Sequence, residues 1–178
     1  MKPVFGLALV LIFFAPVAAQ IKPGILQGAS APTFSAVAMD GTMIDTASLR
    51  GKVVVINLWF VNCPNCVQEI RSLNQLVDQY SNNKDIVFVG LATNRKSDIE
   101  KFLAKNPFKY VIVPNATQVI LTKFGTPDEN GDIVVAFPMH YILDRNGNIL
   151  LKSQGIKGVD AIKKELEDQF STKPAPAK

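Results

Sequence analysis

The chain has two cysteines, and both lie in the stretch NLWFVNCPNCVQEI, which covers residues 57–70. Cys63 and Cys66 are separated by two residues, at the junction between an apolar run and a segment with helical periodicity. A pair with this spacing can serve as a structural disulfide, as half of a metal site, or as a redox reagent that forms and breaks a disulfide.

The first two uses fit the sequence poorly. A staple across this spacing closes a loop of four residues, and chain entropy then gives roughly 2 kcal/mol, near the bottom of what cross-links contribute. A structural zinc site needs four donors, whereas the chain has one histidine, His140, and no further cysteine. Only carboxylates or a second chain could complete that set, so we favour the redox interpretation.

A helix that begins at the cysteines would support this chemistry. Apolar residues recur at spacings of three and four up to Tyr80, which predicts an amphipathic helix. Unpaired backbone N–H groups and the helix dipole favour an anion in the first turn, which lowers the thiol pKa of the exposed N-terminal member, Cys63. Cys66, one turn inside, would then attack the mixed disulfide and release the product. Pro64 suits the first helical position because its φ is fixed and it lacks an N–H.

The surrounding elements alternate between strand and helix. A continuous apolar, β-branched run at 53–60 is typical of a strand buried on both faces. Further strands are predicted at 85–93, 110–113, the end of 126–137, and 140–155. In the last of these, Asn146-Gly147 indicates a hairpin. Further helices are predicted at 96–106, 116–125 and 159–170, and Gly125 is expected to be the C-cap of the second. With a small N-terminal β-hairpin around Asp40-Gly41, this order predicts an α/β fold with a mixed central sheet and helices on both faces.

The two ends of the chain differ from this pattern. Residues 1–19 place one lysine before an apolar run and end in Val17-Ala18-Ala19, as in a secretory signal peptide cleaved after Ala19. The run is shorter than the roughly twenty residues that span a bilayer, so we expect a periplasmic or otherwise exported protein, not an integral membrane protein. We expect a lead-in at 20–30, one domain at 31–171 and a disordered tail at 172–178.

The composition fits one ordered domain. The 178 residues are 48% hydrophobic and 19% charged, which is enough for a single core. The net charge of +4 is spread along the chain without a basic cluster, so nothing supports nucleic-acid binding.

Two motifs together resemble the thioredoxin-like TlpA/ResA family of exported bacterial thiol–disulfide oxidoreductases. The first is NLWFVNCPNCVQE at 57–69, and the second is FPMHYILDRNGNI at 137–149, which looks like that family's cis-proline strand followed by its acidic turn and hairpin. The resemblance spans about 31–170 and implies a thioredoxin-like fold for the domain.

The resemblance also implies roles for individual residues. Cys63 would be the attacking thiol, Cys66 the resolving thiol, and Pro138 the cis-proline beside the disulfide, where its bend lets a neighbouring backbone pair with an extended substrate. Glu69 matches the acidic residue of the C-x-x-C-x-x-E pattern, and a carboxylate one turn beyond Cys66 could relay a proton to or from that thiol. The alternative for Glu69 is an ordinary solvated side chain near a helix N-terminus.

Substrate contacts are expected at Trp59, Pro64, Asn65 and Phe137, although Trp59 could instead fill the core. The chain departs from the family at Asn62, where relatives have Trp, at Arg71, where relatives have Pro, and at Phe137, which is bulkier than the usual Thr or Val. The connection at 125–132 is also longer than usual. These departures bear on substrate choice and redox potential.

The resemblance implies an exported reductant of protein disulfides that receives electrons from a membrane partner and serves cytochrome c maturation or other exported thiols. It implies no cofactor and no metal, and we expect a monomer. A copper-binding chaperone of the Sco type remains an alternative that would use both cysteines and His140, although that family has a C-x-x-x-C pattern and a half-buried strand histidine is the simpler interpretation. A peroxiredoxin-like antioxidant is a further alternative, but VNCPNC lacks the Pro-x-x-x-Thr arrangement of a peroxidatic cysteine. A binding module with an inert disulfide also remains open.

Overall fold

A five-stranded sheet forms the centre of the protein, whose computed structural model describes residues 26–171; the predicted signal peptide and tail lie outside the described residues. The strand order is β5-β4-β3-β8-β9. The strands are β3 (Val53–Trp59), β4 (Ile86–Ala92), β5 (Val111–Val113), β8 (Met139–Leu143) and β9 (Ile149–Gln154). β3, β4 and β5 run parallel to one another, and β8 runs antiparallel to both of its neighbours, β3 and β9. This arrangement confirms the predicted mixed sheet.

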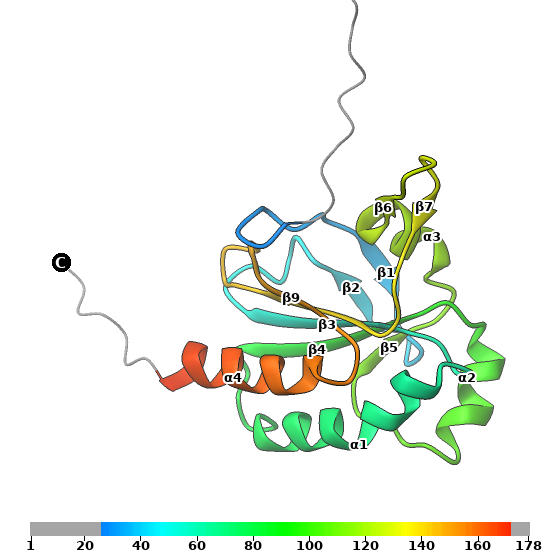
Figure 1. Ribbon diagram of the computed structural model, residues 1–178. Coiled ribbons are helices and arrows are strands. Elements are labelled where there is room, and N and C mark those ends of the chain that lie inside the picture. Colours follow the sequence, from blue (N-terminus) through cyan, green and yellow to red (C-terminus); the bar gives the residue numbers. More distant parts are fainter. Residues whose placement is uncertain (1–25, 172–178) are drawn as a thin grey trace, which may run out of the picture.

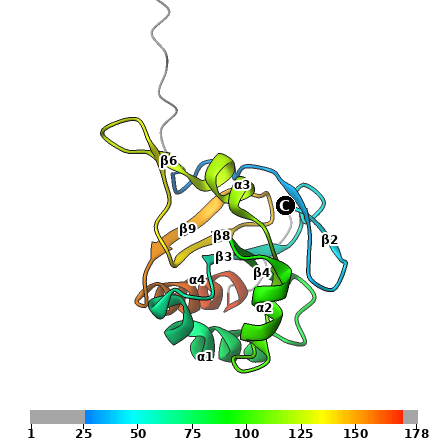
Figure 2. The same cartoon turned by 90° about the vertical axis from the view of Figure 1, so that its right-hand side faces the viewer.

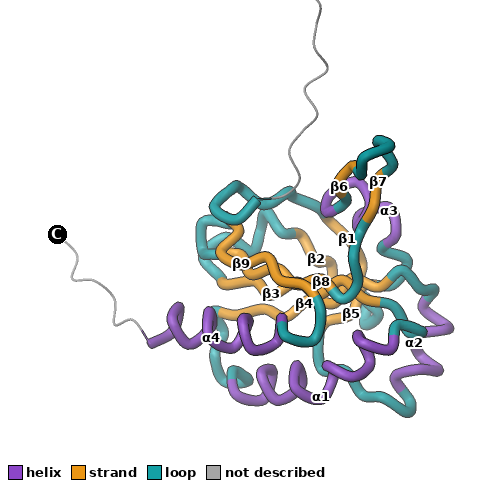
Figure 3. The backbone as a smooth tube through the Cα atoms, in the orientation of Figure 1, coloured by secondary structure: helices purple, strands orange, loops and turns teal. Residues whose placement is uncertain are grey.

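Helices cover both faces of this sheet (Figures 1 and 3). One face carries α1 (Pro64–Gln79) and α4 (Gly158–Ser171), which lie side by side, together with α2 (Lys96–Leu103). The other face carries the short α3 (Thr117–Val119), its π-helical continuation η1 (Ile120–Phe124), and the hairpin of β1 (Ser35–Val37) and β2 (Met43–Asp45). The predicted α/β architecture and N-terminal hairpin are therefore confirmed.

The central strand explains why the core has two layers. All seven residues of β3 are buried, as a strand covered on both faces requires. Val53 and Val55 pack in the cluster under α1 and α4, whereas Val54 and Ile56 pack in the opposite cluster. Because successive side chains point to opposite faces, Asn57 falls on the α1 side.

Two local predictions differ from the structure on the α3 side. The helix expected over 116–125 is a short α-helical turn that widens into η1. Gly125 does not form a left-handed C-cap, since its φ is −70°. A Cβ at Gly125 would collide with Ile133 Cγ2 and the Leu121 carbonyl oxygen, so close packing is the reason for a glycine at this position.

The segment before Pro138 is a separate hairpin and does not join the main sheet. β6 (Thr126–Pro127) pairs with β7 (Ile133–Val134), and the hairpin projects from the body of the protein (Figure 2). Ile133 and Val134 are 52% and 45% exposed. The longer connection noted in the sequence therefore forms an arm with a polar, acidic turn and two exposed apolar side chains, and it ends a few residues before the cis-proline position.

The predicted lead-in and the β8–β9 hairpin meet at one end of the sheet. Gly147 has φ +76° and closes the turn by donating to Asp144 O, as the Asn-Gly signal indicated. Gly28 N donates to Ile149 O, and Ile149 N donates to Ala29 O, so the lead-in is attached to β9. Across residues 26–171, no helix has the length and apolar character needed to cross a membrane.

The packing of α1 on the sheet gives a stability prediction. Leu73 on α1 is fully buried, so Leu73→Ala should lower the free energy of unfolding by roughly 2 to 5 kcal/mol through lost burial and a residual cavity. Leu121→Ala, at a side chain that is 41% exposed, is the control and should change it by less than about 0.5 kcal/mol. Urea unfolding of the oxidised protein measures both, and equal effects would show that α1 is not seated as described.

Candidate active site

A disulfide joins Cys63 to Cys66 at the start of α1. Cys63 is the N-cap, its Sγ accepts a hydrogen bond from the backbone N–H of Cys66 at 3.2 Å, and Pro64 occupies the first helical turn. The two cysteines are 4% and 1% exposed. The expectation of an exposed Cys63 is therefore wrong for the oxidised form, because its sulfur points inward to Cys66, although Cys63 remains the more accessible of the two.

The loop that carries the cysteines is tied to the end of the neighbouring strand. Thr93 N donates to Trp59 O, and Val61 N donates to the side-chain oxygen of Asn94 at 2.9 Å. Asn94 thus holds the turn between β3 and α1 in place. The sequence reasoning missed this residue, since no local pattern distinguishes it from an ordinary loop asparagine.

Pro138 lies at the same end of the sheet as the cysteines. The Phe137–Pro138 peptide bond is cis, which confirms the conformation implied by the resemblance. The β3–β8 ladder ends with Leu58 opposite Met139, so Pro138 comes next to the point where β3 leads into Cys63. The ring of Phe137 packs edge-on against Phe60 with ring centroids 5.2 Å apart.

The predicted substrate contacts divide into buried and exposed residues. Trp59 is 1% exposed, and its ring packs against Phe102 and Phe108 with centroids 5.6 and 5.4 Å away. The expected contact between Trp59 and a substrate is therefore wrong, because the ring fills the core. Pro64 and Asn65 are exposed, so their expected roles remain predictions.

A polar cluster lies on the sheet side of α1, one turn beyond Cys66. Glu69 is only 2% exposed, so its interpretation as a solvated glutamate is wrong. Its Oε1 lies 3.1 Å from Asn57 Nδ2, and its Oε2 lies 3.2 Å from His140 Nε2. Asn57 Nδ2 is also 3.0 Å from His140 Nδ1. We call Asn57, Glu69 and His140 the buried triad.

The triad arises from register and alternation. Asn57 and His140 are paired residues on β3 and β8, and both point toward α1, where Glu69 lies. His140 is fully buried, which corrects the half-buried position expected for it. Asn57 was not predicted, although a lone amide in the otherwise apolar run 53–59 was a usable signal, because a polar side chain in a buried strand needs hydrogen-bond partners.

The negative charge of Glu69 affects the pKa of a neighbouring aromatic residue, Tyr110. Burial raises the pKa of Tyr110 far above its usual value, and the negative charge of Glu69 raises this pKa further. The phenol of Tyr110 therefore stays neutral at physiological pH and provides no second anion beside the triad.

In this structure the imidazole of His140, which the copper-binding alternative requires, is already engaged by other side chains. Both ring nitrogens of His140 face a partner, Asn57 at one and Glu69 at the other. Within the described part of the chain, no three side chains of His, Cys, Asp or Glu come together as a metal-ligand set.

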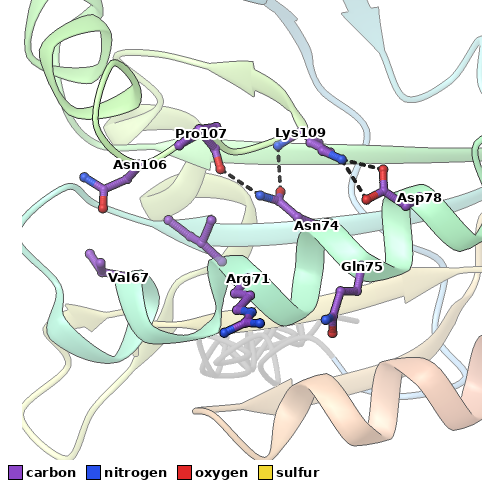
Figure 4. A pocket seen from close by; sticks show the side chains of 9 residues that line it. Val67, Arg71, Asn74, Gln75, Asp78, Asn106, Pro107 and Lys109 are labelled. Atoms are coloured by element: carbon purple, nitrogen blue, oxygen red, sulfur yellow. Dashed lines mark hydrogen bonds and ion pairs between the residues drawn. The ribbon is translucent and has the colours of Figure 1, made fainter.

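An open pocket of about 500 Å³ lies along the outer side of α1 (Figure 4). Asn74 bridges to Pro107 O and Lys109 N, and Lys109 Nζ pairs with Asp78 at 2.6 Å. The lining residues are Val67, Ile70, Arg71, Asn74, Gln75, Asp78, Asn106, Pro107 and Lys109. None of the predicted site residues is among them, so this pocket is separate from the disulfide chemistry.

Comparison with known proteins agrees with this geometry. The model of the AhpC/TSA family matches residues 27–152. The chain is 28% identical over 148 residues to the thioredoxin-like protein YneN of Bacillus subtilis strain 168, covering 83% of this chain and 80% of YneN. It is 25% identical over 142 residues to the thiol-disulfide oxidoreductase ResA of Bacillus cereus, covering 79% and 74%.

A solved structure also shares the fold. The secreted disulfide oxidoreductase of Mycobacterium tuberculosis, described as homologous to E. coli DsbE, superposes with a TM-score of 0.58 at 22% sequence identity. The match covers 76% of this chain and 95% of that chain. The predicted thioredoxin-like fold is confirmed.

The triad gives a stability prediction of its own. Asn57→Ala removes the amide that faces both Glu69 Oε1 and His140 Nδ1. Two buried groups then lack a partner, and we expect a loss of roughly 2 to 4 kcal/mol in the free energy of unfolding. Gln68→Ala, at an exposed amide on α1, is the control and should stay within about 0.5 kcal/mol. Thermal and urea unfolding measure both variants, and an unchanged Asn57→Ala would mean that the triad is not bonded as described.

Proposed function

The chain belongs to the AhpC/TSA family, and from this premise we propose that its Cys63–Cys66 pair reduces disulfides of exported proteins. In its general class the protein is a thiol–disulfide oxidoreductase of the thioredoxin-like type with a C-x-x-C pair. The proposal adds the direction of electron flow, the compartment and the kind of substrate.

The observation that carries the proposal is the position of the disulfide. Cys63 caps α1, and the N–H of Cys66 already donates to its sulfur. When the disulfide is reduced, that N–H and the helix dipole favour the thiolate form of Cys63 over the thiol. Cys66 is the more buried residue of the two and is the natural resolving thiol.

The proposed reaction has two exchange steps. The Cys63 thiolate attacks one sulfur of a substrate disulfide; a Cys63–substrate bond forms, and the second substrate sulfur leaves as a thiolate that takes a proton from solvent. The Cys66 thiol gives its proton to Glu69. The Cys66 thiolate then attacks Cys63 Sγ, which forms the intramolecular disulfide and releases the first substrate sulfur as a thiolate. The substrate disulfide has gained two electrons, and the enzyme dithiol has lost them.

Substrate access is proposed at the surface around the disulfide. Pro64 and Asn65 are exposed beside Cys63, and Phe137 is partly buried next to the cis-proline. These residues, with the backbone next to Pro138, would contact an extended protein segment.

The cellular setting is part of the proposal. The signal-peptide pattern in residues 1–19 and the similarity to a secreted oxidoreductase support export of residues 20–178 after cleavage at Ala19. An oxidising compartment would refill the disulfide continually, so a reductant there needs an electron donor, which we propose to be a membrane protein. Cytochrome c maturation and other exported thiols are the proposed outlets, and the protein is proposed to act as a monomer.

The cysteine variants test the chemistry. Cys63→Ser and Cys66→Ser should each slow dithiothreitol-driven insulin reduction by more than about a hundredfold, because a resolved exchange needs both thiols. Only Cys66→Ser should accumulate a mixed disulfide with insulin, which mass spectrometry detects as an adduct on Cys63. An adduct formed by Cys63→Ser would reverse the two roles. Full insulin reduction by both variants would instead leave an inert disulfide in a binding module.

The reduction potential tests the direction. Equilibration of residues 20–178 in dithiothreitol redox buffers, read by mass spectrometry, should give a value near or below roughly −270 mV, as for a dedicated reductant. A value near roughly −120 mV would mean that the protein makes disulfides. Rapid consumption of hydrogen peroxide by the reduced protein would instead favour the peroxiredoxin-like alternative.

A further inference from the structure

We propose that His140 and Asn57 are positioning residues that hold Glu69 as the proton acceptor for Cys66. This inference rests on the proposed thiol–disulfide exchange and adds residues that the C-x-x-C-x-x-E pattern does not contain. It assigns a role in the resolving step to a strand histidine and to a strand amide.

The hydrogen-bond directions in the triad follow from its geometry. The Nδ2 of Asn57 has two hydrogens and faces two acceptors, Glu69 Oε1 and His140 Nδ1. Because Nδ1 accepts, a neutral imidazole carries its hydrogen on Nε2. That hydrogen points at Glu69 Oε2. With this tautomer, each oxygen of the Glu69 carboxylate receives one hydrogen bond, one from Asn57 and one from His140.

The groups around the triad come from every element packed against it. α1 contributes Glu69 and Cys66, and the residue before β5 is Tyr110, whose phenol stays neutral. β9 contributes Ser153, which pairs with His140 across the β8–β9 ladder. α4 contributes the backbone of Gly158, without an ionisable side chain. The carboxylate of Glu69 is thus the anionic group of this set while Cys66 is in the disulfide.

Gly158, the first residue of α4, packs directly against the imidazole of His140. A Cβ at Gly158 would lie 2.7 Å from His140 Cδ2, 3.3 Å from His140 Nε2 and 3.2 Å from Ser153 Oγ. Only a glycine lets α4 begin directly against the ring without displacing it. An alanine would otherwise be the better residue in a helix, so this glycine is explained by the close approach to His140.

The position of the carboxylate suits the resolving step. Residues three apart on a helix are neighbours on one face, so Glu69 lies next to Cys66 on the buried side of α1. The two bonds from Asn57 and His140 fix the orientation of the carboxylate, and its remaining lone pairs can take the Cys66 proton. Glu69 later returns that proton to solvent, so the triad is unchanged after each turnover.

The resolving step can be measured alone. Reduced protein mixed with excess oxidised glutathione first forms a mixed disulfide at Cys63, at a rate that depends on the glutathione concentration. The protein then closes the Cys63–Cys66 disulfide at a rate that is independent of the glutathione concentration. Trp59 is the sole tryptophan of the chain and packs in the same cluster as both cysteines, so stopped-flow fluorescence follows both phases. Both rates are recorded from about pH 5 to about pH 9.

We expect His140→Leu to slow the closing phase at neutral pH roughly tenfold or more, because a hydrogen bond to a charged group is worth at least this factor. The rise of the closing rate with pH should move to higher pH, while the first phase changes less than about twofold. His140→Gln is the conservative variant: its amide can accept from Asn57 and donate to Glu69, so it should recover most of the rate. A closing-phase pH profile that coincides with wild type in His140→Leu would overturn the inference.

A second variant leaves all three triad residues in place. Gly158→Ala pushes on the His140 ring from α4 and should slow and shift the closing phase in the same direction. Lys157→Ala, at the exposed preceding residue, is its control and should match wild type. If the closing phase of Gly158→Ala also matches that of wild type, the inference fails. This result counts even if His140→Leu does not fold. Failure of the proposed function is a separate result, since wild type itself would then not reduce insulin.

Discussion

The burial of the Glu69 carboxylate constrains the structure around the disulfide. A charged group taken out of water costs several kcal/mol unless donors meet its oxygens. The donors are Asn57 on β3 and His140 on β8, at positions paired in the sheet. Gly158 follows from the same requirement, because α4 packs against the imidazole without room for a side chain. One buried charge thus connects the central strand, its neighbour and two helices.

The same constraint separates the environments of the two sulfurs. Cys63 lies at the end of α1, where a backbone N–H already donates to its sulfur. Cys66 lies inside the first turn, nearly inaccessible, on the helix face that carries Glu69. Two like groups placed in unlike surroundings take different roles in catalysis. In the proposed exchange, the polarity of the helix accounts for Cys63 as the nucleophile, and the buried carboxylate accounts for Cys66 as the resolving thiol.

Two of the residues that depart from the family are exposed, whereas the disulfide and the triad proposed to assist it are buried. The disulfide and the triad are buried, and their geometry depends on sheet register. Asn62 and Arg71 are exposed, and the β6–β7 hairpin presents Ile133 and Val134 to solvent. Substitutions at exposed positions usually change the free energy of unfolding little, so these positions can vary while the buried disulfide and triad keep their geometry.

Local patterns in the sequence determined most of the elements, the redox pair and the start of its helix. Periodicity, the Asn-Gly turn and the C-x-x-C spacing act over a few residues, so they are readable without a fold. The tertiary structure alone decided that Glu69 is buried, that Trp59 faces the core, and that Asn57 meets His140, which is 83 residues away in the chain. Those outcomes depend on strand register and on the approach of α4, and both are set by long-range packing.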